Sequence, residues 1–301
     1  MRVAITGASG FLGRALVQGL FAVGHQVHVL GRNLEQAFSR LPAGVSGSMF
    51  RAGERLEPEA LTGVQAVIHL AGEPLNQRWS HESKARIRDS RVLGTRAVVE
   101  AMSAVGTVQR FVSVSAVGYY GGTHGAEPLT EESAPGSDFL ARVCLDWEAE
   151  ALRAREAGLS TAVARMGVVL HPEGGALHSM LPPFRMGAGG RVGSGKQYVS
   201  WIHRADAVAA LRFLLEHPEL EGPINVTSPE PLPNVEFAHT LGAVLGRPSV
   251  MHVPGFVLKA ALGEMAMVAL EGQRVLPRRL TEAGFAFQFP RLAEALRHLL
   301  T

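Results

Sequence analysis

A glycine-rich turn joins two short apolar runs at the beginning of the chain. Residues 2–6 (Arg-Val-Ala-Ile-Thr) and residues 26–30 (Gln-Val-His-Val-Leu) are rich in β-branched side chains, so each predicts a buried strand. Between them, residues 7–13 (Gly-Ala-Ser-Gly-Phe-Leu-Gly) lead into an amphipathic stretch that predicts a helix ending at Gly24. A strand, a glycine turn, a helix and a second strand in this order predict a βαβ unit, which requires a parallel sheet.

The glycines of this turn follow the spacing G-x-x-G-x-x-G, which differs from the usual dinucleotide pattern G-x-G-x-x-G. Gly7 would let the chain turn sharply, Gly10 would let the backbone approach a pyrophosphate, and Gly13 would let the helix pack closely on the sheet. The helix N-terminus would offer free N–H groups and a positive dipole end to the phosphates. We predict a dinucleotide site that comprises Gly7, Ser9, Gly10, Phe11, Leu12 and Gly13. The alternative is an ordinary turn that binds no ligand.

The end of the second predicted strand indicates which dinucleotide would bind. NAD-preferring sites carry an acidic residue about 20 residues after the glycines, where it holds the ribose 2′-hydroxyl. Here the strand ends in Gly31 and Arg32, and no carboxylate follows before Glu35. A carboxylate would repel a 2′-phosphate, whereas an arginine would pair with it. We therefore expect NADP(H) as the cofactor and Arg32 as a ligand of its 2′-phosphate; the alternative is an arginine that only faces solvent.

Composition excludes several classes of function. The 301 residues are 47% hydrophobic, and their formal net charge of +2 comes without a basic run, so we expect no nucleic-acid partner. The single cysteine, Cys144, excludes an intrachain disulfide, and no two histidines are spaced H-x-x-x-H, so we expect no metal site. The apolar stretch 256–270 is too short and too charged to span a bilayer, and the chain opens directly into its first predicted strand. These features predict a cytoplasmic protein without a signal peptide or membrane partner, and they leave the oligomeric state open.

Predicted strands and helices alternate through the first 165 residues. Alternation of this kind is typical of a parallel sheet with helices on both faces, so we expect an α/β, doubly wound Rossmann fold. The further strands expected are 66–70, 111–115 and 161–169, and the helices between them are 80–104 and 139–157.

The character of the sequence changes after the last of these strands. Residues 171–195 are rich in glycine and proline and predict a long loop, of the kind that is usually functional. Asp206 would cap the next helix, residues 224–226 predict a short strand, and the pattern from Asn234 onward is mostly helical. We therefore expect an NADP-binding domain over residues 1–165, with returns near 197–227, and a smaller, mostly helical substrate-side region over residues 166–196 and 228–301.

Several motifs match a known pattern. Residues 6–13 and residues 69–72 (His-Leu-Ala-Gly) resemble the cofactor motif and the second signature of the extended short-chain dehydrogenase/reductases, which include sugar-nucleotide epimerases and dehydratases. A narrower subgroup, the "epimerase family proteins" with a C-terminal domain of unknown function, is resembled at residues 71–75, 118–121, 182–185, 201–203 and 270–277. The resemblance implies further cofactor-binding residues, of which Glu73 could instead cap a helix: Leu70, Ala71, Gly72, Glu73 and Val168.

The chain departs from this family at the catalytic positions. Family members use a Tyr-x-x-x-Lys pair with a Ser or Thr, and the tyrosine moves a proton to or from the substrate. Leu140 and Cys144 stand where the tyrosine and lysine would be when Glu148 is aligned with a family glutamate. Three residues at the carboxyl end of a predicted strand could replace the missing tyrosine and lysine, namely Ser115, Tyr119 and Tyr120. The alternative for the two tyrosines is that they only pack in the core.

Cations outside the nucleotide motif indicate a substrate. Arg185 and Lys196 lie in or next to the glycine-rich segment and would meet a phosphate or carboxylate if it folded over the cleft; a solvated loop is the alternative. Arg78 and His203 complete the expected substrate site, with purely structural roles as their alternatives. We thus expect an NADP(H)-binding epimerase or oxidoreductase that acts on a small anionic metabolite such as a nucleotide sugar. The alternative is a non-catalytic NADP(H)-binding regulator or sensor.

Overall fold

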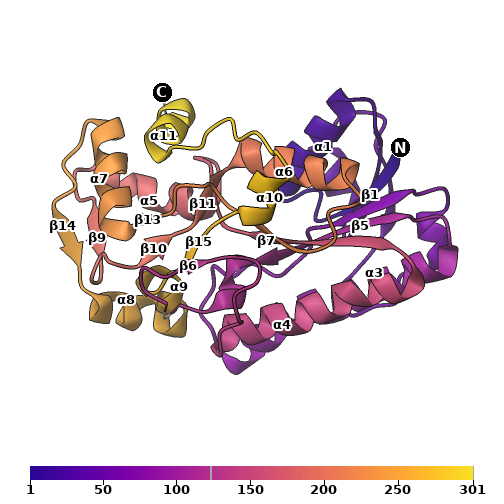
Figure 1. Cartoon of the computed structure of the whole chain (residues 1–301), viewed down its shortest axis with the longest axis horizontal. Helices are drawn as coiled ribbons and strands as arrows, with labels where there is room; N and C mark the ends of the chain where they lie inside the picture. Colours follow the sequence, from indigo (N-terminus) through magenta and orange to yellow (C-terminus); the bar gives the residue numbers. More distant parts are fainter. Residues whose placement is uncertain (123, 301) are drawn as a thin grey trace.

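A seven-stranded sheet forms the centre of the computed structural model, which describes residues 1–122 and 124–300 (Figure 1). Every pairing in this sheet is parallel, and the strand order is β12-β7-β5-β4-β1-β2-β3. The chain therefore starts in the middle, builds one half outward and then returns to build the other, which confirms the predicted doubly wound α/β fold. The strands are β1 (Arg2–Thr6), β2 (Gln26–Gly31), β3 (Ser46–Met49), β4 (Ala66–His69), β5 (Arg110–Ala116), β7 (Ser160–Met166) and β12 (Gly222–Val226).

Helices cover both faces of the sheet because successive side chains of each strand point to opposite sides. Val3 and Ile5 of β1 pack in one apolar cluster, whereas Ala4 between them belongs to the other. In Figure 1 the first face carries α1 and α6 above the sheet, and the second carries α3 and α4 below it. These helices are α1 (Phe11–Ala22), α3 (His81–Val105), α4 (Phe139–Leu152) and α6 (Arg204–Glu216).

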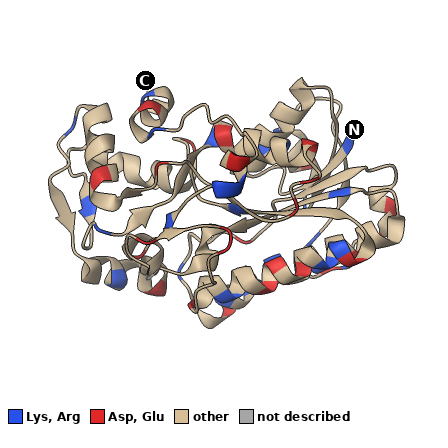
Figure 2. Cartoon of the chain, in the orientation of Figure 1, with Lys and Arg blue, Asp and Glu red and all other residues tan. Residues whose placement is uncertain are grey.

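Residues of both charge signs alternate along α3 and α4, as the colours of Figure 2 show. Arg88 of α3 pairs with Asp146 of α4 at 2.9 Å, and Arg96 pairs with Glu150 at 2.5 Å.

Among the residues described, no helix is long and apolar enough to cross a membrane.

A second, smaller core lies beyond the sheet and joins segments that are far apart in the sequence. It buries Leu177, Phe184, Trp201, Phe237 and Leu296. The elements that carry this core, or lie next to it, are β8 (Val168–Leu170), α5 (Gly175–Arg185), β9 (Gly190–Val192), β10 (Tyr198–Val199), β11 (Trp201–His203), β13 (Leu232–Pro233), α7 (Asn234–Leu245), β14 (Met251–Val253) and α11 (Leu292–Leu300). The remaining short elements are α2 (Leu34–Phe38), η1 (Pro58–Leu61), η2 (Val117–Tyr120), β6 (Pro128–Leu129), η3 (Arg153–Ala157), α8 (Gly255–Leu262), η4 (Gly263–Ala266), α9 (Met267–Leu270), β15 (Arg274–Val275) and α10 (Arg278–Glu282).

The predicted loop over residues 171–195 is wrong, because this segment contains α5 and β9. Leu177, Leu181 and Phe184 recur at spacings of four and three, so one face of α5 is buried in the second core. The apolar spacing therefore outweighs the glycine and proline content of the segment.

Two further details differ from the sequence-based expectations. The strand expected over 161–169 is interrupted at Gly167, so that β7 stays in the main sheet while β8 pairs with β11. Asp206 does not cap α6, because His203 holds that position and its Nδ1 accepts from the Ala205 N–H at 3.0 Å. The Asp206 carboxylate instead accepts from the backbone N–H groups of Gln288 and Phe289, at 2.8 and 2.9 Å.

Candidate functional site

A cleft of about 660 Å³ opens at the carboxyl ends of β1, β2 and β4, and we call it the nucleotide cleft. The predicted glycine turn forms its floor. Gly7 has a φ of 69°, and a Cβ at this position would come within 3.0 Å of the backbone of Leu70 and Ala71. A Cβ on Gly13 would collide with the carbonyl oxygen of Gly7. Glycine is thus required where the turn, the helix and β4 meet.

The N-terminus of α1 is arranged to receive an anion. Gly10 is the N-cap residue and offers no side chain to the first turn, which carries no acidic residue. The backbone N–H groups of that turn are therefore left for a ligand, and the positive end of the helix dipole favours negative charge. This donor set fits a diphosphate group.

Arginines line the far wall of the nucleotide cleft. Arg32, directly after β2, lines it together with Asn33 and Gln36. Arg51, two residues after β3, lines the same wall. Arg51 was not among the predicted cofactor residues, because sequence alone does not show that the segment after β3 lies beside the end of β2.

The near wall comes from the end of β4. Leu70, Ala71, Gly72 and Glu73 all line the cleft, as expected from the second family signature. The Thr6 hydroxyl holds this segment against β1 by accepting from the N–H groups of Leu70 and Ala71, at 3.0 and 3.1 Å.

Not every predicted cofactor residue lines this cleft. The turn residues Gly7, Ser9 and Gly10 do, whereas residues 11–13 form the first turn of α1 behind it. The Phe11 ring lies 5.9 Å from the His171 ring, and Val168 lies in a second cavity.

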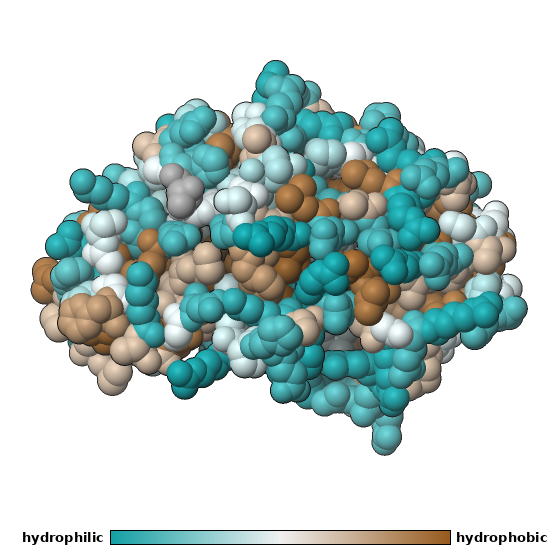
Figure 3. All heavy atoms as spheres, turned by 90° about the horizontal axis from the view of Figure 1, so that it is seen from below, coloured by the Kyte–Doolittle hydropathy of each residue, from teal (hydrophilic) through white to brown (hydrophobic). Residues whose placement is uncertain are grey.

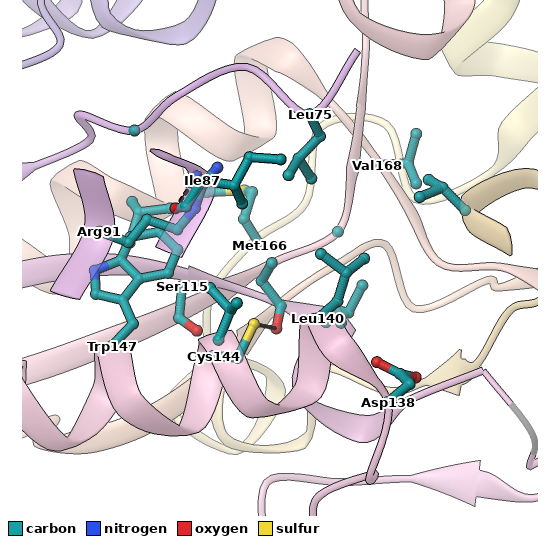
Figure 4. Close-up of a pocket in the computed structure, with 18 of the residues that line it drawn as sticks. Leu75, Ile87, Arg91, Ser115, Asp138, Leu140, Cys144, Trp147, Met166 and Val168 are labelled. Carbon is teal, nitrogen blue, oxygen red and sulfur yellow. Dashed lines mark hydrogen bonds between the residues drawn. The ribbon is translucent and has the colours of Figure 1, made fainter. Parts of the chain in front are cut away.

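The second cavity, of about 350 Å³, adjoins the nucleotide cleft and shares Leu70 and Gly72 with it. We call it the inner cavity. It lies at the carboxyl ends of β4, β5 and β7, and Figure 4 shows α4 along one side of it. Part of its wall comes from the C-terminal part of the chain, through Met267, Val268, Glu271 and Gln273.

Ser115 is the predicted catalytic residue that lines the inner cavity. Its hydroxyl donates to Glu148 of α4 at 2.7 Å. Glu148 in turn accepts from Arg165 of β7, with the shortest contact at 2.8 Å, and all three side chains are buried. This hydrogen-bonded ion pair fixes the orientation of Ser115.

Tyr119 and Tyr120 lie outside both cavities. Tyr120 is fully buried; its hydroxyl donates to Asn225 Oδ1 at 2.7 Å and accepts from Arg165 at 3.0 Å. Burial raises the pKa of Tyr120 to about 12, which opposes loss of its proton near neutral pH. The Tyr119 ring packs against the Arg165 guanidinium, 3.4 Å from the ring centre. Both tyrosines directly follow β5 in the 3₁₀ turn η2, and their contacts are those of the packing alternative.

Leu140 and Cys144 occupy successive turns of α4 and both line the inner cavity. Their positions next to Ser115 agree with the alignment that placed them at the family's catalytic pair. Burial raises the pKa of Cys144 to about 12, so its thiol stays protonated at neutral pH. Neither residue supplies a group that exchanges protons near neutral pH.

The expected substrate cations do not reach the inner cavity. Arg78, Arg185 and Lys196 are exposed and line neither space. His203 is buried under Phe289, with ring centres 4.0 Å apart. Among the described residues that line the inner cavity, Arg91 is the one cation, and Asp138 and Glu271 carry carboxyl groups; Arg91 was not among the predicted substrate residues. Arg91 donates to the carbonyl groups of Glu73 and Ile87, both at 3.0 Å.

Comparison with known proteins supports the same architecture. Residues 3–227 match the NAD dependent epimerase/dehydratase family, and residues 253–299 match a domain of unknown function, DUF1731. The chain is 44% identical to the Epimerase family protein SDR39U1 homolog, chloroplastic, of Arabidopsis thaliana, covering 100% of this chain and 87% of that protein. It is 40% identical to Epimerase family protein Mb2239 of Mycobacterium bovis, covering 99% of this chain and 97% of that protein.

A solved structure extends the match to three dimensions. The crystal structure of the human epimerase family protein SDR39U1 (isoform 2) with NADPH has a TM-score of 0.86 to this chain at 34% identity, and the match covers 99% of each. The cavity-lining residues Met267 to Gln273 fall within the domain of unknown function. The chain therefore belongs to the NAD dependent epimerase/dehydratase family of extended short-chain dehydrogenase/reductases, and it carries the C-terminal domain of the epimerase family proteins.

Proposed function

We propose that this protein binds NADP(H) and transfers a hydride between that cofactor and a small metabolite. The adenosine half would occupy the nucleotide cleft, with the diphosphate at the N-terminus of α1 and the 2′-phosphate between Arg32 and Arg51. The nicotinamide, which supplies or accepts the hydride, would lie beyond Gly72 beside the inner cavity. The observation that carries the proposal is the pair of arginines on one wall of the cleft, where an NAD site would present a carboxylate.

The remaining residues would have distinct tasks. The backbone of Leu70, Ala71 and Gly72 separates the two spaces and would hold the cofactor's extended middle. Ser115, whose proton is donated to Glu148, would accept a hydrogen bond from a hydroxyl group at the reacting carbon of the metabolite. Arg91 would attract a negatively charged metabolite into the inner cavity, and its positive charge is the observation that favours an anionic substrate.

A second candidate function is NADP(H) binding without turnover, as in a sensor. Leu140 and Cys144 favour it, because they stand in the inner cavity where the family's proton-transferring pair would be. Loss of such a pair typically costs about 10²–10⁴-fold in rate.

Transfer of deuterium separates the two functions. The protein is incubated with NADPH that carries deuterium at C4, on either face of the ring, together with a small-molecule extract; binding is measured by native mass spectrometry. We expect NADPH to bind and its deuterium to appear in one metabolite. Binding without deuterium transfer would support the sensor, and a protein that takes up no NADPH would contradict both.

A further inference from the structure

We infer that the inner cavity takes a small, flat, apolar carbonyl compound of the quinone class as hydride acceptor, in place of a sugar nucleotide. The inference rests on the proposed function, because the hydride must come from NADPH. It stands on two features of the cavity, namely the chemistry of its walls and the groups that its polar residues already engage.

The walls of the inner cavity are predominantly apolar. Figure 4 shows Leu75, Ile87, Leu140 and Met166 arranged around the space, with the indole of Trp147 at one end. A nucleoside diphosphate sugar would bring two charged phosphates and many hydroxyl groups, and each one left without a partner would disfavour binding. Flat hydrocarbon rings instead match such a lining, because aromatic and aliphatic side chains make large contacts with them.

Three polar side chains of the cavity, those of Ser115, Asp138 and Arg91, already make hydrogen bonds within the protein. The Ser115 proton points to Glu148 at 2.7 Å, and Asp138 caps α4 by accepting from the Ala141 N–H at 2.9 Å. Arg91 uses one guanidinium nitrogen on two backbone carbonyl groups, yet its positive charge remains in the lining. The lining also holds the carboxyl groups of Asp138 and Glu271, so the charge that can stabilise a negative oxygen is that of Arg91, and the Ser115 proton is not free to be delivered to it.

This balance selects the acceptor. Hydride addition to an ordinary ketone produces an alkoxide, about as basic as hydroxide, and therefore needs a proton donor at hand. Hydride addition to a quinone produces a phenolate, whose conjugate acid is about five to six pKa units more acidic, so it persists without one. A cation such as Arg91 then suffices at the reacting oxygen.

The step is a balanced two-electron reduction. A C–H bond at C4 of the dihydronicotinamide breaks, its hydrogen leaves with both electrons, and an O–H bond forms at one quinone oxygen. The other oxygen becomes a phenolate and takes one proton from water. NADPH is oxidised to NADP⁺, and the quinone is reduced to the hydroquinone.

Duroquinone (tetramethyl-1,4-benzoquinone) is a suitable probe, because its ring is fully substituted and no thiol can add to it. Trp147 lines the cavity, so we expect duroquinone to quench its fluorescence in the protein without cofactor, and a Trp147→Phe variant to lose that part of the quenching. UDP-glucose should not compete. With NADPH present, durohydroquinone should form as the NADPH absorbance falls.

Two variants on one helix supply the matched control. Leu140→Asp places a charge in the inner cavity, whereas Leu145→Asp changes an exposed side chain of α4 that lines neither cavity. We expect Leu140→Asp to weaken duroquinone binding at least about tenfold while NADPH affinity changes less than about twofold, and Leu145→Asp to change neither.

Equal duroquinone affinity in these two variants, or binding of UDP-glucose in preference to duroquinone, would overturn the inference. A wild-type protein that binds NADPH but not duroquinone overturns this inference alone. A protein that does not bind NADPH overturns the proposed function as well, so the two failures are distinguishable.

Discussion

Two arginines from different strands face one wall of the nucleotide cleft. Arg32 follows β2 and Arg51 follows β3, so the parallel sheet brings them together across 19 positions of sequence. Side-chain guanidinium groups form strong, often bidentate hydrogen bonds with phosphate. The preference for a 2′-phosphate should therefore depend on these two residues.

Removing either arginine should weaken NADPH selectively. For Arg32→Ala and Arg51→Ala we expect the dissociation constant for NADPH to rise roughly ten- to a hundredfold and that for NADH to stay within about twofold, by isothermal titration. The matched control is Arg40→Ala, which removes an exposed arginine outside the cleft. Equal losses for NADPH and NADH would contradict a 2′-phosphate contact.

The sequence could predict residues that depend on local geometry, and it failed for those that depend on packing. Gly7 and Gly10 were predictable because a strand and a helix fix what the turn between them must do. For Tyr120 and Lys196 the sequence left structural alternatives open, because their surroundings depend on distant segments: Tyr120 donates a hydrogen bond to Asn225, and Lys196 is exposed outside both cavities.

At the scale of elements, α6 is tied to the C-terminal segment through one carboxylate. Asp206 lies in the first turn of α6, fully buried, and receives the N–H groups of Gln288 and Phe289. A sequence motif pointed to Asp206 as a cap, but the partner segment, 82 residues further on, could not be read from local spacing. Element positions were therefore more predictable than the contacts between elements.

Substitution of this carboxylate should loosen the C-terminal segment. Asp206→Ala removes a buried charged acceptor from two part-buried N–H groups, so we expect the free energy of unfolding to fall by at least about 2 kcal/mol in urea titrations. Hydrogen exchange should rise at residues 288 and 289. Glu216→Ala, which removes an exposed carboxylate from the other end of α6, should cost less than about 1 kcal/mol. Similar losses in both variants would refute the anchoring role.

At the scale of the whole molecule, burial lowers the pKa of several histidines below the ordinary value of 6.5. The shift is large for His69 and His203, each lowered to about 4, with positive neighbours adding to the effect of burial. The others shift in the same direction, so these five histidines bind fewer protons in the folded chain than in the unfolded chain. The group comprises His25, His28, His69, His171 and His203.

Stability should therefore decline on mild acidification. A histidine with a lowered pKa contributes stability above its unfolded pKa and loses it as pH falls toward the folded value. Between pH about 7 and about 5 the free energy of unfolding should fall, at up to about 1.4 kcal/mol per pH unit for each proton taken up. Urea unfolding across this range measures the slope. His69→Leu should flatten the slope, whereas His252→Gln, an exposed control, should not; a pH-independent stability would contradict the prediction.

The exposed surface of the C-terminal part is unusually apolar. Seen from below, hydrophobic atoms gather at the left end of the molecule, where Figure 1 places α8 (Figure 3). Phe256 is 74% exposed, and Val257 and Val268 are 43% and 47% exposed. Sequence alone identified this stretch as apolar but could not place it, because its position depends on the distant residues that it packs against, such as Lys84, which pairs with Glu264.

The wall that Met267 and Val268 give to the inner cavity has a consequence for biosynthesis. A ribosome releases the chain from its N-terminal end, so the glycine turn and β1 to β7 emerge about a hundred residues before this wall does. The nascent protein can then form its nucleotide cleft while the inner cavity is still open to water. The inner cavity is closed on this side only after residues 267–273 have been synthesised, and a shorter product would hold a dinucleotide without this wall beside its reactive ring.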